Sequence, residues 1–280
     1  MKKTAIAILI AVLVVAIGGA LVFAGLSAVH YDFKRLDRTE YVTNTYDFSD
    51  PVERIELACE TADVELAVAR DGSCQVVCFE SDRERYDVSL QDGKLVVRAD
   101  KRKRVWPLFG FKSPKISVYL PAGQYELLQA TLGTGDLTAD KALTFDRLEA
   151  ELGTGDLTLN GIRADQVVVR GGTGDVRLND MAARTADLAL STGRMVLVNV
   201  VCSGDLRCES STGDIRLTDV DAANLYLSAS TGDIEGTILT EKVFSAHANT
   251  GKVSVPATTT GGRCEAETST GNIRLSISGK

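Results

Sequence analysis

The chain has 280 residues and a formal net charge of −7, and 25% of its residues are charged. The length allows one or two domains with a buried core, and the acidic balance argues against nucleic acid as a partner. The composition is ordinary apart from 25 glycines and few aromatic residues, which is typical of a repeat protein rich in turns.

Residues 1–30 form a separate segment. After Lys2 and Lys3, an uncharged run of 26 residues extends from Thr4 to Val29, long enough to cross a bilayer with some tilt. We expect an uncleaved transmembrane helix, and a cleaved signal peptide is the alternative. The short amino-terminal tail favours a single-pass protein of the cell membrane with its carboxy-terminal domain outside the cytoplasm.

A polar linker over residues 31–51 is expected next, followed by a first, degenerate coil with a cap over residues 52–126. In the segment from Arg54 to Leu66, Ala62 takes the place of the glycine that recurs later in the chain. The turn signals Asp71-Gly72 and Asp92-Gly93 predict two hairpins, and a strand is expected over residues 116–120. Together these strands predict an antiparallel cap at the amino-terminal end.

A basic and aromatic loop lies within the cap region, over residues 101–112. It combines cations with large apolar side chains, a pairing suited to an anionic membrane surface or to a protein partner. The structural alternative is a loop that folds over the end of the domain with its charges solvated. The candidate contact residues are Lys101, Arg102, Lys103, Arg104, Trp106, Leu108, Phe109 and Phe111.

Residues 127–280 repeat one short phrase with a glycine every 19 or 20 residues. The glycines are Gly135, Gly155, Gly174, Gly193, Gly213, Gly232, Gly251 and Gly271. Two residues after each glycine the side chain is aliphatic, and buried positions of a second strand are expected seven and five residues before it. The pattern predicts an all-β fold, a single-stack β-solenoid with 19–20 residues per coil. Its last strand, over residues 273–277, is expected to be an open edge that permits end-to-end association of two copies.

The corner of each coil reads small-Thr-Gly-Asp. Glycine supplies backbone angles that are closed to other residues, and Asp accepts a hydrogen bond from a nearby backbone amide. A column of stacked carboxylates would repel itself, and Arg194 and Lys252 are expected to relieve part of that repulsion. Calcium binding by the column is the alternative, although calcium solenoids of the glycine-aspartate type repeat every nine residues.

The sequence offers no convincing catalytic, cofactor or metal site. Cys59, Cys208 and Cys264 occupy inward positions of the repeat, where they act as small apolar residues. Bridges from Cys59 to the neighbouring hairpin and from Cys202 to Cys208 remain open alternatives. The carboxylate pairs Glu149/Glu151 and Glu265/Glu267 lie toward opposite ends of the stack. We therefore expect a protein that is not an enzyme.

The sequence resembles the bacterial putative-adhesin family, a group of β-solenoid domains of unknown function, over roughly residues 52–277. The features that carry the resemblance are the degenerate coil at Thr61-Ala62-Asp63-Val64, the hairpins, the strand before Pro121 and the Ser-Thr-Gly-Asp-Ile phrases that begin at Ser211 and Ser230. The resemblance implies a membrane-linked solenoid displayed at the cell envelope, and it supplies no active-site residues.

The first functional hypothesis is an anchored extracytoplasmic protein that binds or senses an envelope polysaccharide or protein. One alternative is a membrane-surface scaffold that acts through the loop over residues 101–112. The other is a carbohydrate-active enzyme built on the same scaffold.

Overall fold

The computed structural model describes residues 41–81, 84–100, 114–140 and 143–279, together with Gly18 and Phe23, which are helical. The chain divides into two compact units, residues 1–40 with 105–112 and residues 41–104 with 113–280. Among the described residues, no helix has the length and apolar character needed to span a membrane. Apart from Gly18 and Phe23, the predicted anchor lies outside the described residues, and so does the basic-aromatic loop.

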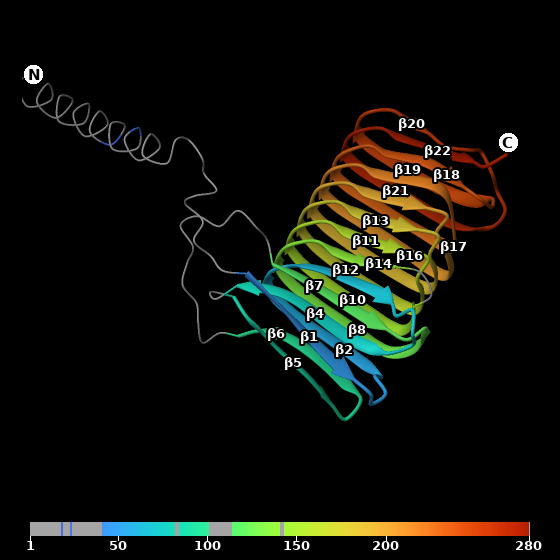
Figure 1. Ribbon diagram of the computed structural model, residues 1–280. Coiled ribbons are helices and arrows are strands. Elements are labelled where there is room, and N and C mark those ends of the chain that lie inside the picture. The colour runs from blue at the N-terminus through green and yellow to red at the C-terminus, as the bar shows by residue number, and fades with distance from the viewer. Residues whose placement is uncertain are drawn as a thin grey trace, which may run out of the picture. The chain divides into compact units, whose positions relative to one another are not determined.

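The second unit is a stack of coils built from two sheets, and within each sheet the strands of successive coils are parallel (Figure 1). Sheet B contains β2 (Arg54–Thr61), β8 (Gly123–Thr134), β10 (Leu143–Thr154), β12 (Arg163–Thr173), β14 (Ala182–Thr192), β16 (Val201–Thr212), the second half of β17 (Ile215–Thr231), β19 (Lys242–Thr250) and β21 (Gly262–Thr270). Sheet A contains β3 (Asp63–Val68), β9 (Leu137–Ala139), β11 (Leu157–Asn160), β13 (Val176–Asn179), β15 (Met195–Val198), the first half of β17, β18 (Ile234–Ile238), β20 (Val253–Ser254) and β22 (Ile273–Ile277). The predicted all-β solenoid is confirmed.

The core is a column of aliphatic side chains between the two sheets. Equivalent residues of successive coils lie side by side, for example Leu157, Val176 and Met195, and each is at most 3% exposed. The sequence reasoning missed one further buried position per coil, which directly follows the second corner. Ile162, Met181, Val200 and Val220 occupy it and are at most 1% exposed.

That second corner depends on a left-handed backbone residue at equivalent positions of four coils. Gly161, Asp180, Asn199 and Asp219 have φ between 52° and 62°. These are the residue types that tolerate this conformation at the lowest cost. The corner therefore has a sequence signature of its own, weaker than the Thr-Gly phrase because three residue types share the position.

The amino-terminal end differs from a simple row of hairpins. The degenerate coil has the predicted register, since Thr61 pairs with Thr134 and Ile55 with Leu128. It is not the outermost coil, because β6 (Lys94–Ala99) and β7 (Lys115–Leu120) pair with β2 and β3 on their other edges.

Antiparallel strands close this amino-terminal end. The hairpin at Asp92-Gly93 joins β5 (Tyr86–Gln91) to β6, as predicted. The turn at Asp71-Gly72 does not form the predicted hairpin, because β7 lies between β3 and β4 (Cys74–Ser81). Residues 41–48, within the predicted linker, form β1 (Tyr41–Phe48), which pairs antiparallel with β4.

The carboxy-terminal end also departs from chain order. β21 lies between β17 and β19, and β22 lies between β18 and β20. The prediction of an open edge at residues 273–277 is wrong for Ile273 and Arg274, which pair with β20. Residues 275–277 pair only with β18 among the described strands, and the terminal strand of sheet B is β19. For the same reason Val253, predicted to point inward, is 43% exposed.

Candidate functional site

The first corner of each coil requires glycine for two reasons. The repeat glycines have φ between 132° and 150°, a region that side chains rarely adopt. In addition, a Cβ atom on Gly193 would lie 1.8 Å from the carbonyl oxygen of Gly174 in the neighbouring coil. The corners are therefore stacked backbone to backbone.

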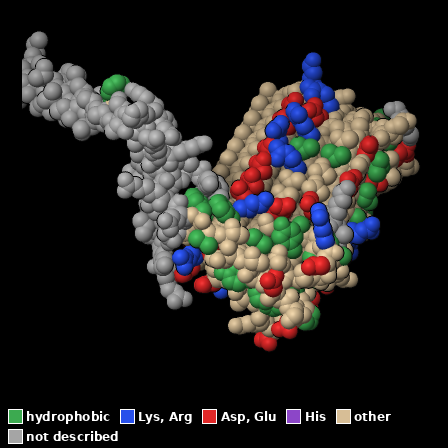
Figure 2. Space-filling model, in the orientation of Figure 1, with side chains coloured by type: hydrophobic (Ala, Val, Ile, Leu, Met, Phe, Trp, Pro, Cys, Tyr) green, Lys and Arg blue, Asp and Glu red, His purple; other side chains and the backbone are tan. Residues whose placement is uncertain are grey.

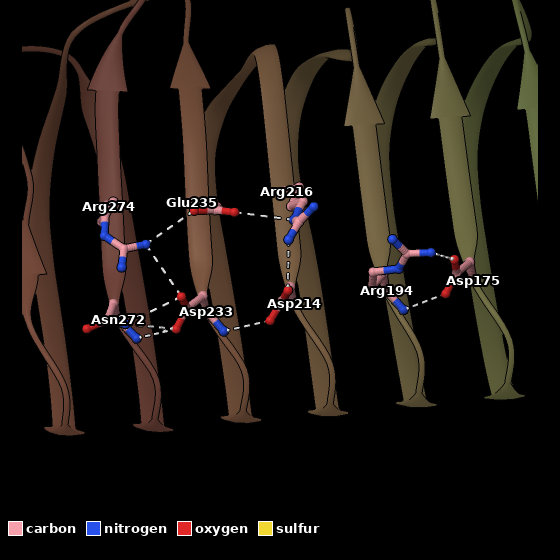
Figure 3. Close-up of polar contacts among 8 residues, drawn as sticks. All are labelled: Asp175, Arg194, Asp214, Arg216, Asp233, Glu235, Asn272 and Arg274. Carbon is pink, nitrogen blue, oxygen red and sulfur yellow. Dashed lines mark hydrogen bonds and ion pairs between the residues drawn. The ribbon is translucent and has the colours of Figure 1, made fainter.

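The aspartates of this corner form a ladder that links one coil to the next. The Asp156 carboxylate accepts a hydrogen bond from the backbone N–H of Asp175 at 2.8 Å, and the Asp175 carboxylate accepts one from the N–H of Arg194 at 2.9 Å. Asp214, Asp233 and Asn272 continue the pattern further along the stack (Figure 3). The predicted turn chemistry is present, but each amide belongs to the neighbouring coil instead of the aspartate's own turn.

Arginines offset the charge of the ladder. Arg194 and Arg177 both contact the Asp175 carboxylate, at 2.7 and 2.6 Å, and Arg274 lies 3.4 Å from Asp233 and 3.3 Å from Glu235. Acidic and basic side chains accordingly follow one another in a row across the coils (Figure 2). The hydrogen bond from the Asp175 amide, with Arg177 second, lowers the pKa of Asp156. The ladder is thus a structural device, and no group of three metal-ligating side chains occurs within the described ranges.

The candidate binding site is a trough on the outer face of sheet B, which we call the sheet B trough. It has a volume of 700 Å³ and crosses six strands, from β8 to β17. Its floor lies two residues before the repeat glycines, where every side chain is small. The floor residues are Gly133, Gly153, Gly172, Ser191, Ser211 and Ser230.

The small floor residues have a steric cause in the first three of these coils. Cβ atoms on Gly133, Gly153 and Gly172 would lie 2.7, 2.5 and 2.3 Å from a carbonyl oxygen of the preceding coil. Larger side chains are therefore excluded here, and backbone forms the surface. Where Ser191, Ser211 and Ser230 follow, the floor is lined by exposed hydroxyl groups.

The wall of the trough is polar and of mixed charge. Glu151, Arg170 and Glu209 lie on it at equivalent positions of different coils, four residues before the glycine. Arg170 is held by a two-pronged ion pair with Asp187 at 3.1 and 2.9 Å. The trough therefore offers hydrogen-bonding groups and apolar surface in about equal parts, whereas the pockets that hold small molecules are mostly apolar.

A second hollow of 880 Å³ continues the trough toward the capped end. It shares Thr131 and Gly133 with the trough and is lined further by β2, β5 and β6. Glu56 on its surface accepts hydrogen bonds from Lys94 and Arg98, which lower its pKa. The two hollows together cross nine strands of one sheet.

Of the carboxylates considered from sequence, only Glu151 lines the trough. Glu149 bonds to Arg147, and Glu265 lies 3.0 Å from Arg263. Four strands separate their strands, β10 and β21, so the two pairs are not brought together. The sequence reasoning missed the trough, although its signal, a small residue before every Thr-Gly, is visible in the repeat.

All six cysteines are buried and unbonded. Burial raises the pKa of the Cys59, Cys202 and Cys264 thiols to about 12. Neither bridge that the sequence left open is formed. Cys208 and Cys264 are two coils apart instead of the three expected from chain order, because β21 pairs directly with β17.

The comparisons with known proteins agree with this fold. The family model described as Toastrack DUF4097 matches residues 52–210 and 204–280. No curated protein matches the chain in sequence.

Among solved structures, a putative adhesin from Bacteroides fragilis is 19% identical with a TM-score of 0.55, covering 85% of this chain and 97% of that one. A putative adhesin from Parabacteroides distasonis is 11% identical with a TM-score of 0.47, covering 85% and 98% of the two chains. A putative lipid binding protein from the same species is 13% identical with a TM-score of 0.44, covering 84% and 97%. The likeness to the Bacteroides fragilis structure shows a shared fold.

Proposed function

This chain belongs to the Toastrack DUF4097 family, and from that premise we propose that it is a membrane-anchored, extracytoplasmic binding protein of the adhesin type. We further propose that it holds an extended, hydroxyl-rich polymer of the cell envelope along the sheet B trough. The anchor part of the proposal rests on the uncharged run of 26 residues from Thr4 to Val29.

The observation that carries the binding proposal is the continuity of the trough. Small residues recur at the same position in six successive coils, and the usual strand spacing of about 4.8 Å gives a floor about 24 Å long. A channel of this length suits a chain-like ligand better than a compact one. Its hydroxyl, carboxylate, guanidinium and backbone groups favour a polysaccharide over an apolar peptide or a lipid tail.

No catalytic step is included in this proposal. Glu149 and Glu265 each form an ion pair with an arginine of their own strand, and the two carboxylates on the trough wall, Glu151 and Glu209, lie three strand steps apart on β10 and β16. A glycosidase requires two carboxylates placed on either side of one glycosidic bond. We therefore propose binding without hydrolysis.

The test is co-sedimentation of residues 41–280 with purified cell-wall polysaccharide. Replacing Ser211 and Ser230 by Tyr would fill the floor of the trough. We expect the affinity for the polymer to fall about tenfold or more, because the tyrosine rings occupy the space in which the polymer would lie. The matched control places the same two tyrosines at Thr138 and Thr158, on the outward face of sheet A, and should bind as the wild type does. Equal binding by all three proteins would refute the trough as the site.

The same preparation distinguishes the membrane-surface alternative. If the domain instead binds anionic liposomes, and Trp106→Ala with Phe109→Ala abolishes that binding, the function belongs to the basic-aromatic loop. Polysaccharide binding that survives the loop substitutions but not the trough substitutions supports the proposal.

A further inference from the structure

At the carboxy-terminal end of the solenoid, sheet B ends in the edge strand β19. β19 pairs with β21 along one edge, and no strand in the described part of the chain pairs with its other edge. Alternate backbone N–H and C=O groups of a terminal strand face outward, so that such an edge can accept another strand. β19 is nine residues long, which is enough to form a stable pairing.

The apolar face behind this edge is also incompletely covered. Phe244, Ala246 and Ala248 point toward the core but are only half-buried, whereas the equivalent Leu225, Leu227 and Ala229 of β17 are at most 3% exposed. Val243 is 45% exposed. Solenoids normally end in a capping repeat with a polar outer surface, and this end has none within the described residues.

The lysine that could protect the β19 edge points into the protein. A lysine on an edge strand normally opposes pairing with a second chain. The only lysine of β19, Lys242, is 3% exposed, lies 2.7 Å from the Asp221 carboxylate and bonds to Thr240. Its charge is therefore neutralised within the protein, and the edge is left without this protection.

The other end of the molecule presents a different edge of sheet B, that of β5. β5 pairs antiparallel with β6, and β4 and β1 extend sheet A antiparallel beyond β7, so the two ends are built differently. A head-to-tail contact would generate an open filament between unlike surfaces. Two identical β19 edges can instead meet about a twofold axis, which closes the assembly at two copies.

The sequence of β19 is self-complementary in this arrangement. In an antiparallel pairing centred on Ala246, Phe244 faces Ala248 of the second copy, so that a large side chain meets a small one. Ser245 faces His247, and Lys242 faces Thr250, so that no two like charges are opposed. We infer that two copies of this chain associate tail to tail through antiparallel pairing of their β19 strands.

A charge-exchange experiment on the full-length chain in detergent tests this inference. Ser245 and His247 are both exposed, so substitutions there leave the core unchanged. Ser245→Lys with His247→Lys opposes two lysines at each of two places, and we expect the dimer to dissociate at least tenfold more readily. Ser245→Lys with His247→Glu opposes lysine to glutamate and should restore the wild-type dissociation constant.

The readout is molar mass by sedimentation as a function of concentration. A dimer that the Lys/Lys variant weakens and the Lys/Glu variant restores would establish the β19 contact. The inference is overturned if the wild type stays monomeric at its solubility limit. It is equally overturned if the Lys/Lys variant dimerises as strongly as the wild type, since the contact would then lie elsewhere, for example between anchors.

Discussion

At the scale of the residue, the fold depends on the glycine of the first corner more than on any aliphatic side chain. A core leucine can lie beside a smaller residue of the next coil, as Leu206 does beside Ala186, but the corner glycine faces a carbonyl oxygen with no space between them. The glycine of the Thr-Gly phrase recurs from coil to coil for two reasons. Its backbone has a positive φ, and the backbone of the neighbouring coil leaves no space for a Cβ atom.

Replacing Gly193 by Ala should therefore be severe. The new Cβ atom would lie 1.8 Å from the Gly174 oxygen and at a φ of 134°, so we expect the free energy of unfolding to fall by about 4 kcal/mol or more. Gly72→Ala is the matched control, because its φ is also positive, at 73°, but no atom lies within 4 Å. There a loss of about 1 kcal/mol is expected. Urea unfolding of both variants measures the difference, and equal losses would contradict the argument from close approach.

At the scale of the element, the aspartate ladder adds side-chain hydrogen bonds to the strand pairing that joins the coils. Because a hydrogen bond from the Asp175 amide and the Arg177 guanidinium lower the pKa of Asp156, the folded state holds this carboxylate ionised more firmly than the unfolded chain does. The stabilisation is present above the ordinary value of 3.8 and is lost as the pH falls through the lowered pKa.

The corresponding prediction is that Asp156→Asn weakens the dependence of the free energy of unfolding on pH in the acid range. The amide oxygen of Asn can still accept the Asp175 N–H, but the side chain no longer titrates. The free energy of unfolding should therefore decline less between neutral pH and about pH 3 than in the wild type. Denaturant titrations across this range provide the measurement, and parallel curves for the two proteins would show that the ladder does not couple to protonation.

The alternation of buried and exposed residues in the coils, and hence the coil register, could be predicted from sequence. Most inward slots are aliphatic, small or a cysteine, with Phe145 and Phe244 as aromatic exceptions, and the Thr-Gly phrase fixes the register. The order of the strands at either end could not be predicted in the same way, because an aliphatic slot fits any neighbouring coil equally well.

β21 approaches β17 closely through a glycine that β19 lacks. A Cβ atom on Gly262 would lie 1.7 Å from the Ala223 oxygen, and the residue of β19 in the same register is Lys242. The trough escaped prediction for a related reason. A small residue before each Thr-Gly has no periodic hydrophobic signal, and its effect appears only when the coils are stacked.

At the scale of the whole molecule, the six buried thiols are expected to make the free energy of unfolding fall as the pH becomes alkaline. The pKa values of Cys59, Cys202 and Cys264 are about 12, against an ordinary value of 9.0, so the unfolded chain loses these protons first. Stability is fully present below pH 9 and is lost as the pH rises toward the folded-state values. The slope is at most about 1.4 kcal/mol per pH unit for each thiol.

We therefore expect the urea midpoint to fall between neutral pH and about pH 10.5. A variant with Cys202→Ala and Cys264→Ala should lose less stability over the same interval, because two titrating groups are absent. An identical pH dependence in the two proteins would assign the effect to other groups.

The position of β21 also has a consequence for how the molecule is made. β19 and β20 leave the ribosome before β21 and β22, yet the later pair lies between them and the rest of the stack. Coil-by-coil folding during synthesis can therefore proceed only as far as β18. The native strand order is reached after the last residues are available, when the carboxy-terminal segment inserts beside β17 and the earlier coil docks on its outer edge.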